Sequence, residues 1–162
     1  MQRRQEQQKD TSSQITLYSS THTTNWDYEH NYFSKNTTTT QVPLSIFSGA
    51  QAPLQALVTY LRDIECLSFK EMAQLLNRAE STLRVTHANA KNTPLTFLEH
   101  DVLYIPADVF SGVLSVLEVV VVRLHQAGLR NIDVASFLNK DPRTTSTILR
   151  RAKKKGVMHD DA

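Results

Sequence analysis

From residue 42 the chain reads Val42-Pro-Leu-Ser-Ile-Phe-Ser-Gly49, and 63 positions later it reads Ile105-Pro-Ala-Asp-Val-Phe-Ser-Gly112. The proline, phenylalanine, serine and glycine are identical in the two octapeptides, and a branched apolar residue precedes the proline in both. Self-similarity at a fixed spacing is the signature of a repeated structural unit. The sequence therefore predicts two copies of one fold, and the similarity continues beyond each octapeptide.

An apolar stripe follows each octapeptide. Leu54, Leu57, Val58 and Leu61 recur 63 positions later as Leu117, Val120, Val121 and Leu124. Their spacing places all four side chains on one face of a helix. After residues 64–65 the offset falls to 62, which aligns Leu67 with Leu129 and Asn77 with Asn139. The first copy therefore carries one extra residue at the end of this helix.

A short helix, a turn and a longer helix follow in the first copy. Ser68 and Glu71 have the spacing of a capping box, which predicts a helix after Ser68. Its expected buried residues are Met72, Ala73, Leu75 and Leu76. Asn77 tolerates the left-handed backbone and is expected to end this helix. The longer helix is predicted over residues 81–91, with Leu83, His87 and Ala90 on its inner face.

The second copy has clearer signals at the same places. Asn139 is expected to end its short helix, Asp141 to cap the longer helix, and Pro142 to fill the first helical position. Leu149 and Ala152 are expected to face inward. Each copy thus has the order of helices found in a helix-turn-helix.

These stretches resemble region 4 of bacterial sigma factors and the related three-helix domains of response regulators. Ser68-Phe-Lys-Glu-Met-Ala-Gln-Leu-Leu-Asn-Arg-Ala-Glu-Ser-Thr-Leu-Arg84, with Ala90-Lys91, carries the resemblance in the first copy. Residues 131–139, Thr144 and residues 151–153 carry it more loosely in the second. The resemblance implies an all-α fold of two tandem three-helix helix-turn-helix units, each presenting its last helix to a major groove.

Two positions depart from the family pattern. His87 stands where the family has a large apolar residue, and Thr145 replaces the apolar residue that should follow Thr144. The threonine is expected to weaken the inner face of the last helix. No segment typical of core-polymerase binding or promoter melting precedes the first copy, so a complete sigma factor is not expected.

The expected organisation has five parts. Residues 1–41 form a mostly disordered tail rich in Gln, Ser and Thr, 42–92 the first unit, 93–104 a linker with room for one short helix, 105–155 the second, basic unit, and 156–162 an acidic C-terminal end. Four aromatic residues between Trp26 and Phe33 form a patch in the tail, which is either a sticky segment without a partner or a binding motif.

The charge is concentrated in one helix. The whole chain has a net charge of only +2, yet residues 143–155 contain six basic residues and no acidic one. This predicts contact with a phosphate backbone. The predicted DNA-binding residues of the second unit are Arg143, Ser146, Thr147, Arg150, Arg151, Lys153, Lys154 and Lys155, and those of the first are Ser81, Arg84, Asn89 and Lys91.

Within this set the expected roles differ. Arg143, at the start of the helix, is the candidate for reading guanine, whereas the later lysines would neutralise phosphates. Two alternatives for the basic cluster are a complement to the helix dipole and a nuclear-localisation signal. The first unit has only Arg84 and Lys91 as cations on its corresponding face, so it either reads bases with little phosphate attraction or packs against a protein.

Several functional classes are excluded by composition. Cys66 is the single cysteine, the histidines are scattered and there are only four glycines, so no disulfide, metal site, phosphate-binding loop or cofactor is expected. The N-terminus has no secretory signal, and the longest apolar run, residues 119–122, is too short for a membrane span. A cytoplasmic protein is expected, or a nuclear one in a eukaryote. Glu99-His100-Asp101 is interpreted as a solvated linker face, so an enzyme is not expected.

The function expected from the sequence is DNA binding, as a transcriptional regulator with double-stranded DNA as its partner. The alternative is an adaptor or assembly protein that docks RNA polymerase or another protein through residues 18–33 or the first unit, with the basic helix as a non-specific anchor. RNA binding is disfavoured because the basic helix carries no aromatic residue on which bases could stack.

Overall fold

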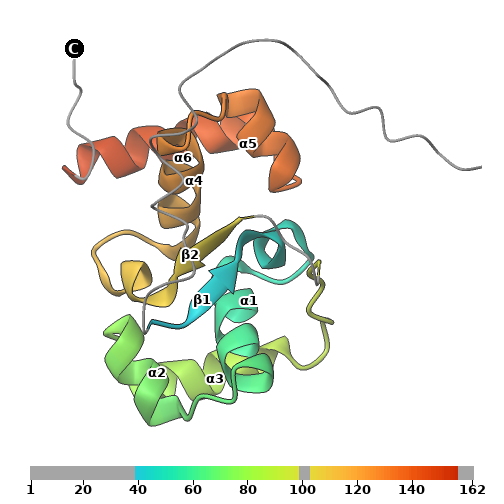
Figure 1. Ribbon diagram of the computed structural model, residues 1–162, viewed down its shortest axis with the longest axis vertical. Coiled ribbons are helices and arrows are strands. Elements are labelled where there is room, and N and C mark those ends of the chain that lie inside the picture. Colours follow the sequence, from blue (N-terminus) through green and yellow to red (C-terminus); the bar gives the residue numbers. More distant parts are fainter. Residues whose placement is uncertain (1–38, 99–102, 157–162) are drawn as a thin grey trace, which may run out of the picture.

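The computed structural model describes residues 39–98 and 103–156, so most of the predicted tail, part of the linker and most of the acidic C-terminal end lie outside it (Figure 1). The described elements, in chain order, are β1 (Gln41–Pro43), η3 (Leu44–Ser48), α1 (Pro53–Thr59), η4 (Tyr60–Ile64), α2 (Phe69–Leu76), α3 (Glu80–Ala90), β2 (Tyr104–Pro106), η5 (Ala107–Ser111), α4 (Val116–Gln126), α5 (Asn131–Phe137) and α6 (Pro142–Lys154). The prediction of a mostly helical fold is confirmed.

Most predicted helix ends are confirmed as well, whereas α3 spans Glu80–Ala90, one residue earlier at each end than the expected 81–91. Ser68 accepts a hydrogen bond from the backbone N–H of Glu71, whose carboxylate accepts one from the N–H of Ser68, so the capping box is formed. Asn77 and Asn139 both adopt the left-handed conformation, with φ angles of 49° and 51°. Asp141 caps α6 and Pro142 occupies its first turn. These local signals set where α2 begins and ends, where α5 ends and where α6 begins.

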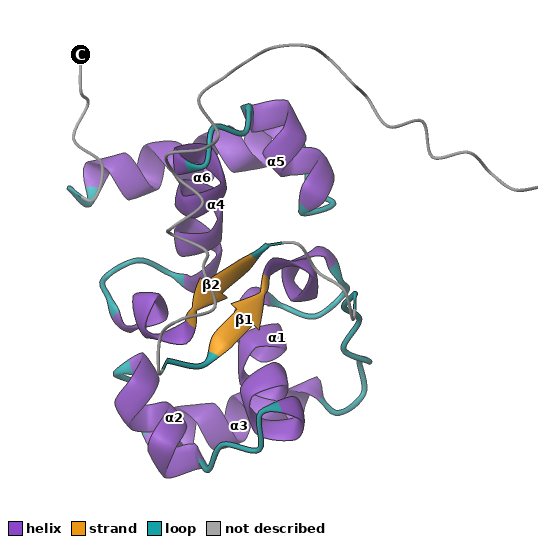
Figure 2. Ribbon diagram, in the orientation of Figure 1, coloured by secondary structure: helices purple, strands orange, loops and turns teal. Residues whose placement is uncertain are grey.

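Two short strands join the repeats, a feature that the helical pattern did not predict. β1 and β2 pair antiparallel, with Val42 directly opposite Ile105, its repeat equivalent (Figure 2). A proline follows each of these residues, and a residue before proline is held in an extended conformation. Leu44 N–H donates to the Leu103 carbonyl, and Ala107 N–H donates to the Thr40 carbonyl, both at 2.9 Å. The two halves are therefore paired about a local two-fold axis.

The extra residue of the first repeat lies in a π-helix. η4 continues α1, and the N–H of Glu65 donates to the carbonyl of Tyr60, five residues earlier. One inserted residue in an α-helix is what a π-turn accommodates. α4, the equivalent helix of the second repeat, has no such turn. The chain then turns through a left-handed residue in both repeats, Cys66 in the first and Gly128 in the second.

One hydrophobic cluster runs through both repeats. α1 packs against α3 in the first repeat and α4 packs against α5 and α6 in the second, while α2 packs against η5 and α1 touches α4 between the repeats. Figure 1 shows α5 and α6 on one side of the strand pair and α2 and α3 on the other. The last helix of each repeat thus lies at a different end of the molecule.

In the linker, residues 93–98 form no helix, and residues 99–102 lie outside the described part of the chain. None of the helices described between residues 39 and 156 has the length and apolar character needed to cross a membrane. The unit boundaries expected from the sequence stay a prediction.

Candidate nucleic-acid interface

α6 carries the predicted basic residues on one side. The residues on its opposite, inner side pack against the rest of the second repeat and so set which side of the helix faces outward. Thr145, Ile148 and Ala152 are buried against the rest of the second repeat, while Leu149, expected inside, is only partly buried. The buried threonine is not a weak point, because its hydroxyl donates a 2.8 Å hydrogen bond to Asn131 Oδ1 and lies 3.0 Å from the Pro142 carbonyl. The expected weakening of this face is offset by a polar partner on α5.

The opposite side of α6 is exposed. Positions 143, 147, 150 and 154 follow a helical spacing of i, i+4, i+7 and i+11, which stacks their side chains in one row. Arg143, Arg150 and Lys154 are exposed and Thr147 is partly buried. Arg151 and Lys153 flank the row on either side and are exposed too. Five cations thus share one face of a single helix.

Four of these cations have no acidic partner within residues 39–98 and 103–156. Arg143, Arg150, Arg151 and Lys154 form neither an ion pair nor a side-chain hydrogen bond in this part of the chain. An unpaired row of guanidinium and ammonium groups is open to an external anion without first breaking an internal bond. This row, Arg143, Arg150, Arg151 and Lys154, is called the basic row below.

Other predicted contacts are partly occupied. The hydroxyl of Ser146 accepts a 2.9 Å hydrogen bond from Asn131 Nδ2, and the hydroxyl of Thr147 donates to the carbonyl of Arg143 in the preceding turn. Both side chains are therefore held in place by the protein itself. They flank the basic row as oriented polar groups.

Lys155 points away from the basic row. Its ammonium group lies 2.7 Å from the carboxylate of Glu118, a buried residue in the first turn of α4. Burial raises the pKa of Glu118, but hydrogen bonds from Lys155 and Ser115 outweigh it, and the pKa lies below its ordinary value. The ion pair ties the end of α6 to the start of α4, so Lys155 has a structural partner.

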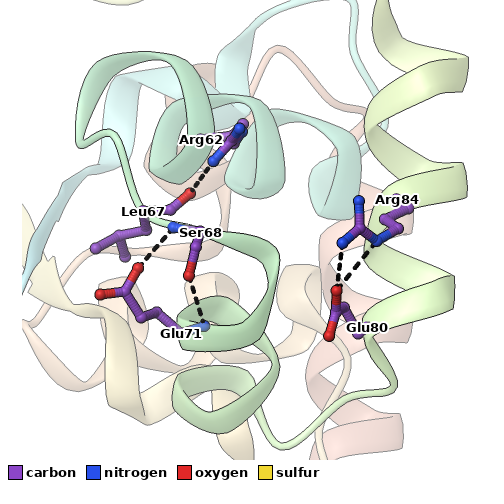
Figure 3. Close-up of polar contacts among 6 residues, drawn as sticks. All are labelled: Arg62, Leu67, Ser68, Glu71, Glu80 and Arg84. Carbon is purple, nitrogen blue, oxygen red and sulfur yellow. Dashed lines mark hydrogen bonds and ion pairs between the residues drawn. The ribbon is translucent and has the colours of Figure 1, made fainter.

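In the first repeat, the equivalent helix α3 carries a neutralised face. Arg84 forms an ion pair with Glu80 one turn earlier, as the dashed lines of Figure 3 show. Its guanidinium also lies 4.7 Å from the centre of the Phe69 ring, and Arg62 lies 5.0 Å from the same ring. Arg62 in turn donates to the carbonyl of Leu67. Both arginines are thus committed to contacts within the repeat.

The remaining predicted residues of the first repeat, Ser81, Asn89 and Lys91, are exposed. Between Ser81 and Asn89 the surface of α3 also presents Val85, which is 60% exposed, and Ala88. This face is small and nearly uncharged. The basic row therefore lies on the last helix of the second repeat, whereas the corresponding helix of the first repeat has a mostly neutral face followed by one exposed lysine, Lys91.

Asn131 is a residue that the sequence analysis missed. Its amide nitrogen donates to the Pro142 carbonyl and to Ser146, and its amide oxygen accepts from Thr145, so it fastens α5 to the first turn of α6. The sequence does contain a sign of the contact between Asn131 and Thr145. The repeat aligns Asn131 with Phe69 and Thr145 with Leu83. Two polar residues replace two apolar ones together, which is typical of a contacting pair.

Two segments to which the sequence analysis assigned a role lie outside the part of the chain that the structure describes. They are the aromatic patch within residues 18–33 and Glu99-His100-Asp101. Within residues 39–98 and 103–156, no group of His, Cys, Asp and Glu side chains is arranged to hold a metal ion.

Comparison with protein-family models, with curated proteins and with solved structures finds no match for the chain.

Proposed function

We propose that this chain is a DNA-binding protein, a transcriptional regulator that contains two tandem helix-turn-helix units and inserts α6 into a major groove of double-stranded DNA. The basic row on α6 is the observation that carries the proposal. Arg143, Arg150, Arg151 and Lys154 are exposed and unpaired within the described residues, and α6 contains no acidic residue. The four cations of the basic row exceed what complementing a helix dipole requires.

The local architecture supports the proposal. A three-residue turn separates α2 from α3, a four-residue connection separates α5 from α6, and the last helix of each pair is the longer one. In helix-turn-helix proteins the second helix reads base edges while its flanks contact phosphates. Arg143 is the second residue of α6 and its N–H donates to the capping Asp141, so its side chain lies at the start of the helix that would enter the groove.

Binding to a random-sequence duplex of about 20 base pairs tests the proposal, by fluorescence anisotropy over a series of salt concentrations. The affinity should fall linearly with salt on logarithmic axes, because bound cations displace counterions from DNA. Lys154→Gln should weaken binding and reduce the slope by about 1. Lys70→Gln is the matched control, since Lys70 is an exposed lysine on α2 and its loss changes the net charge equally.

The absence of salt-dependent binding, or equal losses in the two lysine variants, would contradict the proposal. Lys91→Gln reports on the first unit in the same assay. A loss of affinity there would mean that α3 also contacts DNA.

A second candidate is an adaptor that docks a protein, such as a polymerase, on the first unit. The neutral face of α3 favours it, since Val85 is exposed there while Arg84 is paired with Glu80. Val85→Glu should then abolish capture of RNA polymerase without changing the affinity for DNA. Unchanged capture would exclude α3 as the docking surface.

A further inference from the structure

A cavity of about 470 Å³ lies in the first repeat, away from the basic row. Its walls come from α1, η4, α3 and the start of the linker, so it opens between the helices and residues 93–97. This volume lies within the range of sites for small molecules, about 300–1,000 Å³. The apolar part of its wall consists of Ile64, Ala90, Pro94, Leu95 and Phe97.

Two residues of this wall, Gln51 and Thr59, each carry a buried polar atom that has no hydrogen-bond partner among the described residues. Gln51 is only 6% exposed, and its amide nitrogen donates to the Thr93 carbonyl at 2.5 Å, but its amide oxygen accepts no hydrogen bond from any described residue. The hydroxyl of Thr59 is equally buried and unbonded within the described chain. An unsatisfied buried polar group costs about 1–3 kcal/mol, so such groups need an explanation.

The second repeat provides an internal comparison. The residues equivalent to Gln51 and Thr59 are Leu114 and Val122, which are both buried. They line a smaller cavity of about 240 Å³ in the second repeat. The second repeat therefore forms the corresponding helix with apolar residues at these two places.

The π-turn adds a further difference between the repeats. η4 supplies Asp63 and Ile64 to the cavity wall, and the second repeat has no corresponding turn. π-turns are frequent at functional sites, because they redirect side chains. Asp63 Oδ1 lies 2.9 Å from His87 Nε2, so this carboxylate has a partner at the rim, and Lys91 adds one exposed cation to the wall.

From these features we infer that the cavity of the first repeat binds a small nitrogen heterocycle, whose N–H group donates to Gln51 Oε1. The ring would lie against Leu95 and Phe97, and the hydroxyl of Thr59 would bond a second polar atom of the ligand. The inference does not depend on DNA binding. It gives the first repeat a ligand site, whereas the basic row belongs to the second.

Indole and 1-methylindole form a matched pair of probes, since methylation removes the N–H donor and leaves the apolar body. Titration of the full chain, followed by ¹H–¹⁵N NMR, should show shifts at the backbone amides of residues 93–97. Indole should bind at least about fivefold more tightly than 1-methylindole, because one hydrogen bond to a buried acceptor contributes about 1 kcal/mol or more. Gln51→Leu should remove this preference.

Thr59→Val tests, without any ligand, whether the buried hydroxyl of Thr59 lacks a hydrogen-bond partner. Valine is the residue of the second repeat at this position, and it replaces an unbonded hydroxyl by a methyl group of similar size. The melting temperature should rise by about 2–4 °C. A lower melting temperature would show that an ordered water satisfies the hydroxyl, and this result would overturn the proposal.

Two outcomes of the titration with indole and 1-methylindole would contradict the proposal. Equal binding of both probes, or the absence of shifts from either, would overturn the assignment of an N–H donor to Gln51. Salt-dependent DNA binding is measured separately, so a failure here leaves the function proposed for α6 standing.

Discussion

Phe47 and Phe110, which occupy the same position in the two repeats, pack against each other with their ring centroids 5.8 Å apart. Both are fully buried. Together with the pairing of Val42 and Ile105, this contact places repeat-equivalent residues face to face at the centre of the molecule. The repeats therefore meet as the two subunits of a symmetric dimer do, but within one chain.

Phe110→Ala should destabilise the whole chain, because the cavity it leaves lies in the core that both repeats share. Large-to-small changes at buried phenylalanines cost about 3–5 kcal/mol. Urea unfolding followed by circular dichroism should show one transition with a lowered midpoint. Val113→Ala is the control, since Val113 is 82% exposed and should change the stability by less than about 0.5 kcal/mol. Two separate transitions would mean that the repeats unfold independently.

Thr145→Val should cost about 1–2 kcal/mol, although valine is nearly isosteric, because Asn131 Oδ1 loses its donor. The double variant Asn131→Ala with Thr145→Val should be less destabilised than the sum of the two single changes, by at least about 0.5 kcal/mol. The free energy of unfolding of the four proteins measures this coupling. Additive losses would show that the hydrogen bond contributes little.

The Lys155–Glu118 pair should make the protein sensitive to acid. The pKa of Glu118 is lower in the folded chain than its ordinary value of 4.5, so its contribution to stability is complete above that pH and is lost as the pH falls through the folded pKa. The melting temperature should therefore drop more steeply between about pH 5 and pH 3 in the native chain than in Glu118→Gln. Identical profiles would contradict this role.

Lys155→Met separates the ion pair from the capping box. Ser115 still bonds the carboxylate in this variant, but the burial of Glu118 is no longer opposed by the ammonium group. The stability should fall by about 1–3 kcal/mol at neutral pH. The acid-induced drop should become smaller.

Arg143→Ala should change which sequences are bound rather than how strongly DNA is held in general. Selection from a random duplex library should give a clear consensus for the native chain and a relaxed one for the variant, with a discrimination loss of about 1–3 kcal/mol at one base pair. Lys154→Ala should weaken binding to all sequences alike. An unchanged consensus in Arg143→Ala would remove this residue from base recognition.

The start and end of α2, the end of α5 and the start of α6 were predictable from sequence because each depends on a local signal. Ser68 and Glu71 are three positions apart, and Asn77 and Asn139 end their helices through their own backbone preference. The same holds for the basic row, since a helical spacing alone decides which side chains share a face. The conformational preferences and hydrogen bonds of neighbouring residues are sufficient to predict these helix ends and this row.

The contacts between the repeats were not predictable in this way. Three residues per strand give no alternating pattern, and the partner of Val42 lies 63 positions away in the sequence. The π-turn appeared only as a gap in the alignment of the repeats, which indicates an extra residue but not how a helix absorbs it. Likewise Thr145 looked like a defect until Asn131 was placed beside it.

The local two-fold axis relates two halves of one chain, and each half can acquire substitutions that the other lacks. In a homodimer every substitution occurs twice, so a pocket or a positive surface gained by one subunit is imposed on the other. A single chain with paired halves is free of this constraint: Gln51 lines its cavity while Leu114 fills the matching place, and Arg84 is paired with Glu80 while the basic row of α6 forms no ion pair with a described residue. Because both repeats belong to one chain, the backbone keeps its two-fold arrangement while each repeat carries a different surface or cavity.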